Sequence, residues 1–466
     1  MEALTAVRAL TYLRLMATFD NVTHMLKKLS IFIFLTLLLS GCYHIRDPAA
    51  DSISQTVCER AGYEVSWERK APLCKEEVIE CLCMGPLTAD AAVQIALFNS
   101  PKIQALFEEV GIAQSDLVNA SLIANPVFGA AVRLPDGSFP AWNTEIDALQ
   151  PIVNILLRPI RKRMASLELA STMSRVTSEL FQFIEMVSET FYKTQAAMIN
   201  LEWQAQIMEA EELSYLVVQK QIEVGNTNEL ESDIYFENYQ EALLLYEAMK
   251  IELNTLRQEL AQLMGVFDFE ICSYVTLPPS IGTAKDELVM LAFENRYDLF
   301  SSRLTTDSIA TSMGLYQWYA YTDFAAGVAY EKEIDGTPKT GPGFALEVPI
   351  FNFGQGDRMR TRALLCQNVQ QTRDLCLQIQ QEVDTYYEGM VISQKRATQL
   401  QNNVIPHRKD LIDQTLRFYN FMNASVFDLL EAKVAELSSE MMLVEAQRDY
   451  LIYRVQLIRS LGGFTP

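Results

Sequence analysis

The chain has 466 residues, and its hydrophobic content of 49% is too high for a disordered protein. Its formal net charge of −21 leaves no basic surface that could neutralise phosphates, which argues against nucleic-acid binding. Such an acidic balance is typical of a solvated surface, and it also suits a lumen that favours cations.

The N-terminal region carries an export signal. From Met25 the sequence reads MLKKLSIFIFLTLLLSGC, in which two lysines precede an apolar run from Leu29 to Leu39. This run is too short to span a bilayer comfortably and is typical of a secretory signal. Its ending resembles a bacterial lipobox, whose cysteine becomes the lipidated first residue. We therefore expect residues 1–41 to be a leader and signal peptide, with Met25 the better start, and Cys42 to carry a covalent lipid that anchors the protein to a membrane.

Residues 42–86 are expected to form an extended lipidated tether, because they show no clear hydrophobic period. Four cysteines cluster there, and in an oxidising compartment they permit two disulfides: Cys58, Cys74, Cys81 and Cys83. A metal site at Cys81-Leu-Cys83 is the alternative, disfavoured by its spacing and by the lack of a nearby histidine. Cys366 and Cys376 stand in a helical run and are expected to be buried apolar residues.

Two helices and two strands are predicted next. The first helix covers Leu87–Asn99, with Thr88 as a plausible N-cap. A second helix runs from Pro101 to about Ala124, where Asn125-Pro126 stops it. Two strand-like runs then cover residues 127–134 and 143–153, joined by a turn at 135–138.

A very long helical hairpin follows. Residues 160–224 contain no Gly or Pro, and a continuous helix of 65 residues would be about 98 Å long. Its apolar residues recur at threes and fours, which is the stripe that coiled-coil packing needs: Val176, Leu180, Phe183, Val187, Phe191, Met198 and Leu201. After a tip at residues 225–228, a return helix is predicted to reach Met264.

The second half of the chain repeats this order. Helices are predicted at 286–295 and 297–318, strands at 321–334 and 343–353 around a turn at 335–338, and a hairpin at 357–461 with its tip at 420–423 and a kink at Pro406. Landmarks recur about 198 residues apart, such as Gln150-Pro151-Ile152-Val153-Asn154 and Val348-Pro349-Ile350-Phe351-Asn352. Gly225 matches Met422 in the same way. We infer a tandem repeat covering 87–270 and 286–463.

The strands have the pattern of a transmembrane barrel. In the first strand of the second repeat, small or charged residues occupy one face. The other face carries the apolar residues Phe324, Ala326, Val328, Tyr330 and Ile334. Four strands cannot close a barrel, and an open sheet edge is forbidden in lipid. Several chains must therefore contribute strands to one barrel, with the hairpins packed below it as a helical tube.

Taken together, six segments make the chain from Leu87 to Gly463 similar to the TolC-type outer-membrane efflux proteins: LTADAAVQIALFNSP, SLIANPVF, GNTNELESD, NRYDL, VPIFNFGQGDR and RSLGG. The resemblance implies an α+β membrane protein that forms a homotrimer. It implies a twelve-stranded transmembrane β-barrel, four strands from each chain, in the bacterial outer membrane. A long periplasmic α-helical barrel would continue this barrel, with its tips closing into an aperture.

A finer likeness concerns the cargo. Tyr419-Asn420-Phe421-Met422, followed by Val426-Phe427-Asp428-Leu429-Leu430, resembles the second tip of the heavy-metal and copper efflux branch, and other branches usually carry a glycine where this chain has Asn423 and Ala424. The resemblance therefore favours metal-cation export. Drugs and secreted proteins stay open as alternative cargo.

No enzyme constellation is present in the sequence. The histidines, His24, His44 and His407, lie far apart, and no Walker-type phosphate loop appears, so a partner must supply the energy. We expect a passive conduit without a cofactor other than the lipid on Cys42. A periplasmic adaptor (membrane fusion) protein and an inner-membrane pump would dock on its tips, at Gly225, Asn226, Met422 and Asn423.

A gate is expected at these tips. Rings of Glu229, Asp233 and Asp428, brought together by threefold symmetry, would select for cations. The competing interpretation is that these carboxylates are ordinary solvated charges at helix starts, where they favour the helix dipole. Two other classes of protein stay open: a structural coiled-coil lipoprotein, which leaves the strands unexplained, and a periplasmic adaptor, which does not need two matching strand pairs.

Overall fold

The structure is a computed structural model that describes residues 48–65, 67, 79, 82, 85–133, 143–279, 281–319, 323–348 and 350–464. Contacts divide the chain into Met1–Pro48 and Ala49–Pro466, and the elements below belong to the second unit, apart from the first residue of α2. The signal peptide and Cys42 lie outside the described residues.

The cysteine predictions are tested only in part. Cys74, Cys81 and Cys83 lie outside the described residues, whereas Cys58 is exposed and free. Cys366 is also exposed, so the prediction that it is buried is wrong. Its place on α11 explains the difference, because much of that helix is exposed in the single chain. Cys376, two to three turns along, is half-buried.

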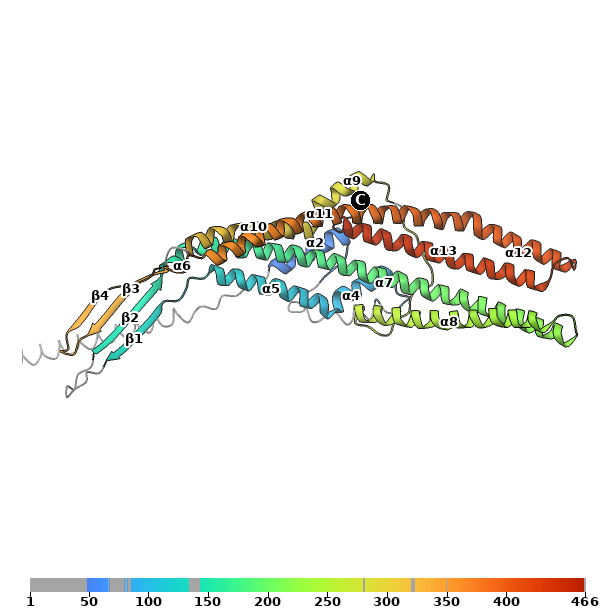
Figure 1. The fold of residues 1–466 in the computed structure, drawn as a ribbon, viewed down its shortest axis with the longest axis horizontal. Coiled ribbons are helices and arrows are strands. Elements are labelled where there is room, and N and C mark those ends of the chain that lie inside the picture. The colour runs from blue at the N-terminus through green and yellow to red at the C-terminus, as the bar shows by residue number, and fades with distance from the viewer. Residues whose placement is uncertain are drawn as a thin grey trace, which may run out of the picture. The chain divides into compact units, whose positions relative to one another are not determined.

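The first half of the unit has the predicted order of elements (Figure 1). Thr88 caps the first of these helices by accepting a hydrogen bond from the backbone N–H of Ala91, and Pro101 occupies the first turn of the next, where a missing N–H costs nothing. The elements are α4 (Ala89–Asn99), α5 (Pro101–Ser121), β1 (Val127–Arg133), β2 (Asn143–Pro151), α6 (Ile152–Leu156), α7 (Arg158–Glu223) and α8 (Glu229–Met264). The 66-residue helix α7 confirms the predicted long helix, and α8 packs against it as the return arm.

The second half follows the same order from α9 onward. Its elements are α9 (Lys285–Asn295), α10 (Tyr297–Tyr319), β3 (Asp323–Lys332), β4 (Pro338–Glu347), α11 (Gln355–Gln399), the π-helical turn η1 (Leu400–Val404), α12 (Ile405–Asn420) and α13 (Val426–Ser460). The predicted irregularity near Pro406 takes the form of η1. Proline lacks an N–H and its ring collides with the carbonyl four residues earlier, and a widened turn just before it accommodates both.

The four strands form one antiparallel sheet in the order β1-β2-β3-β4. β4 begins five residues earlier than predicted, because the turn is tighter: Gly336 adopts φ 87° and the backbone N–H of Glu333 donates to Thr337 O at 3.1 Å. Pro338 and Pro342 are tolerated because β4 is an edge strand. β2 ends at Pro151, and the residues predicted to extend it form α6 instead.

The pairing register gives the sheet two different faces. On one face lie mainly apolar side chains: Phe128, Ala130, Val132, Ile146, Ala148, Phe324, Ala326, Val328, Tyr330, Phe344 and Leu346. On the other lie small and charged residues, among them Glu145, Asp147, Glu331 and Lys339. The apolar face is open, with Phe128 73% and Phe344 66% exposed. This confirms the predicted alternation along the strands.

One helix was not predicted. Residues 48–61, expected to be part of an extended tether, form helix α2 (Pro48–Ala61). Ala50, Ile53 and Val57 share one side of this helix and are buried. The guanidinium of Arg60 donates to the backbone oxygens of Asn295 and Gly462, both at 3.0 Å. Helix α2 is therefore packed onto the helical body.

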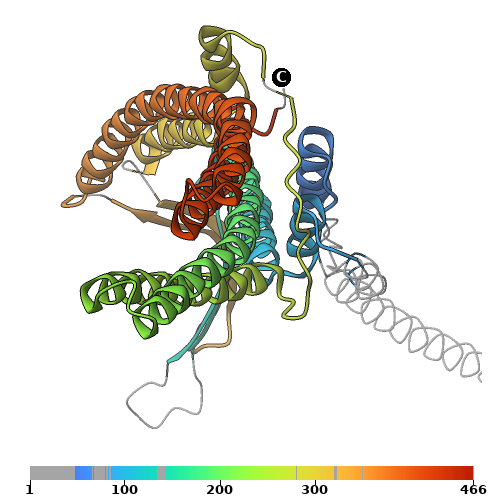
Figure 2. The same ribbon diagram turned by 90° about the vertical axis from the view of Figure 1, so that its right-hand side faces the viewer.

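The core consists of two apolar clusters. The first joins α2, α4 and α5 to the middle of α7 and the end of α8, around Phe107, Phe183 and Leu260. The second joins α9, the start of α10, α11 and α13 around Leu288, Val383 and Tyr450. α13 also packs along α7, and Figure 2, seen from the hairpin tips, shows these helices next to each other. None of the helices in the described part of the chain combines the length and apolar content needed to cross a bilayer.

Candidate functional site

The first hairpin tip connects α7 to α8 through a left-handed residue. Gly225 has φ 75°, and its N–H donates to Ile222 O at 2.9 Å, while the N–H of Asn226 donates to Gln221 O at 2.8 Å. This is a Schellman end, in which two carbonyls left free by the helix are satisfied. Three residues after Gly225, the Asn228 side chain caps α8 by accepting from the N–H of Glu231 at 3.0 Å.

The second tip, between α12 and α13, has the same construction. The N–H of Met422 donates to Tyr419 O at 2.9 Å, and the N–H of Asn423 to Phe418 O at 2.8 Å. Met422 has φ 58°, the one positive φ at a non-glycine residue in the described part of the chain. Ser425, three residues later, caps α13. Gly225 and Met422 thus occupy equivalent places, as their alignment in the sequence predicts.

The three predicted gate carboxylates are all exposed near these tips. Glu229 and Asp233 lie in the first turns of α8. Asp428 belongs to a capping box, in which its carboxylate accepts from the N–H of Ser425 at 2.7 Å. This hydrogen bond lowers the pKa of Asp428. Within one chain Asp428 therefore stabilises a helix start, and a gating role for the three carboxylates stays a prediction.

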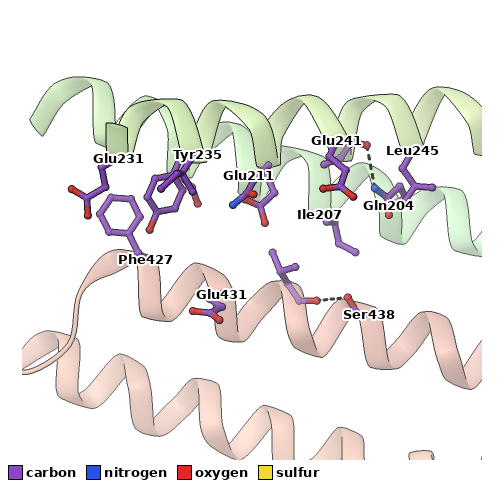
Figure 3. A pocket seen from close by; sticks show the side chains of 15 residues that line it. Gln204, Ile207, Glu211, Glu231, Tyr235, Glu241, Leu245, Phe427, Glu431 and Ser438 are labelled. Atoms are coloured by element: carbon purple, nitrogen blue, oxygen red, sulfur yellow. Dashed lines mark hydrogen bonds between the residues drawn. The ribbon is translucent and has the colours of Figure 1, made fainter. Parts of the chain in front are cut away.

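Between the two hairpins, close to their tips, lies an open groove of about 690 Å³ (Figure 3). Helices α7 and α8 form one wall and α13 the other. Its lining combines apolar side chains with carboxylates and amides: Gln204, Ile207, Glu211, Ser214, Glu231, Ile234, Tyr235, Asn238, Glu241, Ala242, Leu245, Phe427, Glu431, Val434 and Ser438. The predicted gate residues do not belong to this lining.

A pair of aromatic rings connects the two walls. Tyr235 on α8 stacks on Phe427 on α13, with ring centroids 4.7 Å apart and planes inclined by 29°. Figure 3 shows the two rings facing each other at the tip end of the groove. Among the described residues this is the one aromatic pair between α8 and α13. Burial raises the pKa of the Tyr235 hydroxyl, and the Glu231 and Glu431 carboxylates raise it further.

The charges that line the groove have one sign. Glu211 comes from α7, Glu231 and Glu241 from α8, and Glu431 from α13, and no lysine or arginine is among the fifteen lining residues. Burial raises the pKa of Glu211, and the facing Glu431 raises it further. These carboxylates were not singled out from the sequence. The available signal was Glu211 itself, which stands at helical spacing between the buried Ile207 and Ser214.

A second polar cluster lies farther from the tips and contains Arg296 and Asp298 of the segment NRYDL. Arg296 is 6% exposed, and its guanidinium donates to Asp298 and to Glu382 on α11. Glu382 also pairs with Arg459 at 3.3 Å, and Arg459 donates to Glu185 on α7 at 2.8 Å. The cluster joins α7, α10, α11 and α13. Burial, which outweighs the attraction of Arg459, raises the pKa of Glu185.

Metal ligands do not gather in the described residues. No group of three or more His, Cys, Asp or Glu side chains there has a geometry that could hold a metal ion. His407, the one described histidine, lies near the start of α12, next to Pro406. The carboxylates that line the groove carry charges of one sign, and like charges repel one another across the groove.

Comparison with known proteins identifies the fold. No protein-family model and no curated protein matches the sequence. The structure is similar to the Campylobacter jejuni outer-membrane channel CmeC, with a TM-score of 0.69 and 14% identity over 80% of this chain and 85% of that one. It is also similar to the outer-membrane protein VceC of Vibrio cholerae, with a TM-score of 0.67 and 16% identity over 81% and 96% of the two chains. The open state of the Neisseria gonorrhoeae outer-membrane channel MtrE is similar as well, with a TM-score of 0.64 and 13% identity over 80% of this chain and 88% of that one. The chain therefore has the fold of these outer-membrane proteins.

Proposed function

We propose that the chain is the outer-membrane channel of a tripartite efflux system, a passive homotrimeric conduit that carries small substrates to the cell exterior. The observation that carries this proposal is the open four-stranded sheet with one exposed apolar face, in a fold shared with outer-membrane channels. In an aqueous compartment such a face would be an aggregation liability, whereas in a bilayer it is the surface that lipid contacts.

The open edges of the sheet support a trimer. β1 and β4 each have a neighbouring strand on one side. In lipid their free N–H and C=O groups would remain unsatisfied, because the bilayer core offers no hydrogen-bonding partner. If β4 of one copy pairs with β1 of the next, three copies close a twelve-stranded barrel with the apolar face outward and Glu145, Asp147 and Glu331 toward water.

The helices support a tube built from several copies. α8 exposes apolar side chains along much of its length, including Leu230, Ile234, Phe236, Leu244, Leu245 and Ile251. Helices of neighbouring copies would cover these side chains. In this arrangement the two matching halves of the chain are tandem copies of one unit, which places two similar hairpins from each chain around a common axis.

The proposal also assigns roles to the ends of the molecule. The lipid on Cys42 would anchor the chain to the outer membrane, and helix α2 would fix the start of the tether on the body. The hairpin tips, at Gly225, Asn226, Met422 and Asn423, would receive a periplasmic adaptor that connects the channel to an inner-membrane pump. The pump supplies the energy, so the channel itself performs no chemistry.

Metal cations are the cargo that we propose, on the sequence of the second tip and on the acidic character of the region. Glu229, Asp233 and Asp428 would form rings that favour cations over anions at the periplasmic entrance. A strain lacking the protein should then become sensitive to metal salts, with little change for drugs. Equal sensitivity to drugs would instead favour a channel whose cargo includes drugs.

Native mass and conductance test the channel. We expect the membrane-extracted protein to be a trimer in mild detergent and to form pores in planar bilayers. Neutralising Glu229, Asp233 and Asp428 together should lower the preference of these pores for cations, and Glu223→Gln, an exposed carboxylate before the first tip, is the matched control. A monomer that is soluble without detergent would favour a structural lipoprotein or a periplasmic adaptor instead.

A further inference from the structure

A second cavity lies away from the hairpin tips, where the end of helix α2 meets the helical body. It has a volume of about 210 Å³ and is lined by the last residue of α2, Ala61, by the start of α4, by the middle of α7 and by the end of α13. Tyr192, on the α7 wall, packs against both apolar clusters of the core. The cavity is therefore located where the two halves of the chain meet.

Two hydrogen-bond donors in this cavity lack an acceptor. The Nε atom of Arg454 is buried without a hydrogen-bond partner, and among the described residues Arg454 takes part in no ion pair. The hydroxyl of Tyr192 also makes no hydrogen bond within the described part of the chain. A buried donor without an acceptor costs free energy, and an oxygen atom of a ligand would remove this cost.

The two donors are near enough to act on the same group. The pKa of Tyr192 is raised to about 12, by burial first and then by Asp90, and the positive charge of Arg454 opposes this rise. Tyr192 therefore keeps its proton at neutral pH and remains a donor. A phenol and a guanidinium beside each other suit an anionic oxygen, because hydrogen bonds between charged groups are the stronger ones.

The other charges of the lining determine which anion fits. Arg459 is already paired, with Glu185 at 2.8 Å and with Glu382 at 3.3 Å. Asp90 is exposed and accepts a hydrogen bond from the Tyr63 hydroxyl at 2.7 Å. The lining thus contains two arginines and two carboxylates, without a net charge. A dianion would be repelled by the carboxylates about twice as strongly as a monoanion, so the site favours a single negative charge.

We propose that this cavity binds a small monocarboxylate, whose oxygens accept hydrogen bonds from Arg454 and Tyr192. Its short aliphatic part contacts the apolar lining at Ile184, Val455 and Ile458. The bound molecule connects α7 to α13 and also steadies the end of α2, which lines the same cavity. The site lies apart from the hairpin tips and from the sheet, so it does not depend on the proposed channel function.

Ligand-observed NMR with butyrate tests the site. Saturation transfer from the full-length protein in detergent to butyrate is measured at neutral pH over a concentration series. We expect saturable transfer, weaker transfer to the neutral analogue butyramide, and poor displacement of butyrate by sulfate at equal ionic strength. The absence of saturable transfer would mean that water alone satisfies the two donors, and it would overturn the proposal.

Substitutions of the two donors locate the binding. Arg454→Gln should weaken butyrate binding about tenfold or more, whereas Arg454→Lys keeps a positive charge and should lose less. Tyr192→Phe keeps the ring and should weaken binding about threefold to tenfold. The matched control is Lys193→Gln, which removes an exposed positive charge of α7 outside the lining and should leave binding unchanged. Wild-type affinity in Arg454→Gln, or an equal loss in the control, would overturn the proposal.

Asp90→Asn tests the preference for a single negative charge. Because it removes one repelling carboxylate, we expect it to tighten butyrate binding about twofold and to let sulfate compete at a severalfold lower concentration. Sulfate that competes as well in the wild type as in this variant would contradict the choice of a monocarboxylate.

Hydrogen exchange of α2 provides a second readout in the same samples. Saturating butyrate should slow exchange of residues 50–60 about twofold to fivefold in the wild type, because a ligand that binds the packed state stabilises it. It should have no such effect in Arg454→Gln. Equal slowing in both proteins would place the butyrate effect elsewhere and overturn the proposal.

Discussion

Gly225 and Met422 hold the same left-handed conformation at equivalent turns, with different side chains. A side chain at positive φ costs about 1–2 kcal/mol, because its Cβ crowds the backbone. The Met422 side chain is 94% exposed, so it gains almost nothing from packing in one chain. The second tip is therefore strained in the single chain, and a partner that covers Met422 would compensate for the strain.

One substitution at each of the two positions tests this strain. We expect Met422→Gly to stabilise the second tip by about 0.5–1 kcal/mol and Gly225→Ala to destabilise the first by about 1 kcal/mol. An added Cβ at Gly225 meets no atom within 4 Å, so the cost there comes from the backbone alone. The readout is exchange of the Asn423 and Asn226 amides, whose hydrogen bonds close the two turns. Slower exchange of Asn226 in Gly225→Ala would contradict the argument.

Asp428 gives the second tip a dependence on acid pH. Its pKa in the folded chain is below the ordinary 3.8, because its carboxylate accepts the N–H of Ser425. A lowered pKa stabilises the folded helix start above the ordinary value, and this contribution is lost as the pH falls through the lowered value.

The corresponding prediction concerns the start of α13. Asp428→Asn should speed exchange of residues 426–430 at pH 6 and remove the further loss of protection that the wild type shows below pH 3.8. Asp233→Asn, an exposed carboxylate of α8 outside a capping box, is the control and should change neither. Protection at pH 6 that equals the wild type would mean that the capping box contributes little to this helix start.

At the scale of elements, periodicity predicted the long helices and the alternation of the strands well. Residues 160–224 and Phe324–Tyr330 show their periods clearly, because the apolar side chains of each lie along one continuous face. The start of β4 was predicted less accurately, because Pro338 fits a turn as well as the first position of an edge strand. Helix α2 was missed because its few apolar residues, Ala50, Ile53 and Val57, make a weak stripe.

The groove could not be predicted from the sequence for a different reason. Tyr235, Glu211 and Glu431 lie on three helices, and only the packing of α13 along α7 brings them together. Each of them, taken alone, is an ordinary polar residue on a helix. The first tip, in contrast, depends on local turn chemistry, and its position was predicted because Gly225-Asn226 and Asn228 carry that chemistry in the sequence. The second tip was predicted from its match to the first.

Docking of α2 depends strongly on one side chain. The guanidinium of Arg60 donates to two backbone oxygens and lies 4.6 Å from the centre of the Tyr297 ring. We expect Arg60→Ala to lower the free energy of local opening of α2 by about 2 kcal/mol, because charged hydrogen bonds to partly buried carbonyls are lost. Exchange of residues 50–60 measures this opening. Gln55→Ala, on the exposed side of α2, should have little effect, and equal effects of the two variants would contradict the role of Arg60.

At the scale of the whole molecule, the sheet and the helices expose surfaces of opposite polarity. The sheet exposes an apolar face, whereas α11 and α12 expose many charged and polar residues. A single compartment cannot suit both surfaces. In the proposed channel the sheet would lie in lipid and the helical hairpins in water, and the boundary would fall where β2 and β4 pass into α6 and α11.

Two neighbouring positions on β3 test this assignment. Val328 lies on the apolar face, 56% exposed, and Ala329 lies on the opposite face between Asp147 and Gly341. A lysine that faces the lipid at mid-bilayer costs about 2–4 kcal/mol, whereas a lysine on the water-filled side meets Asp147 and costs little. We expect Val328→Lys to reduce the amount of assembled trimer in the outer membrane strongly and Ala329→Lys to leave it near the wild-type amount. Unfolded chains of both variants expose the same added charge, so different yields report the environment of the two faces. Equal yields would place both faces in water and remove the main support for the channel.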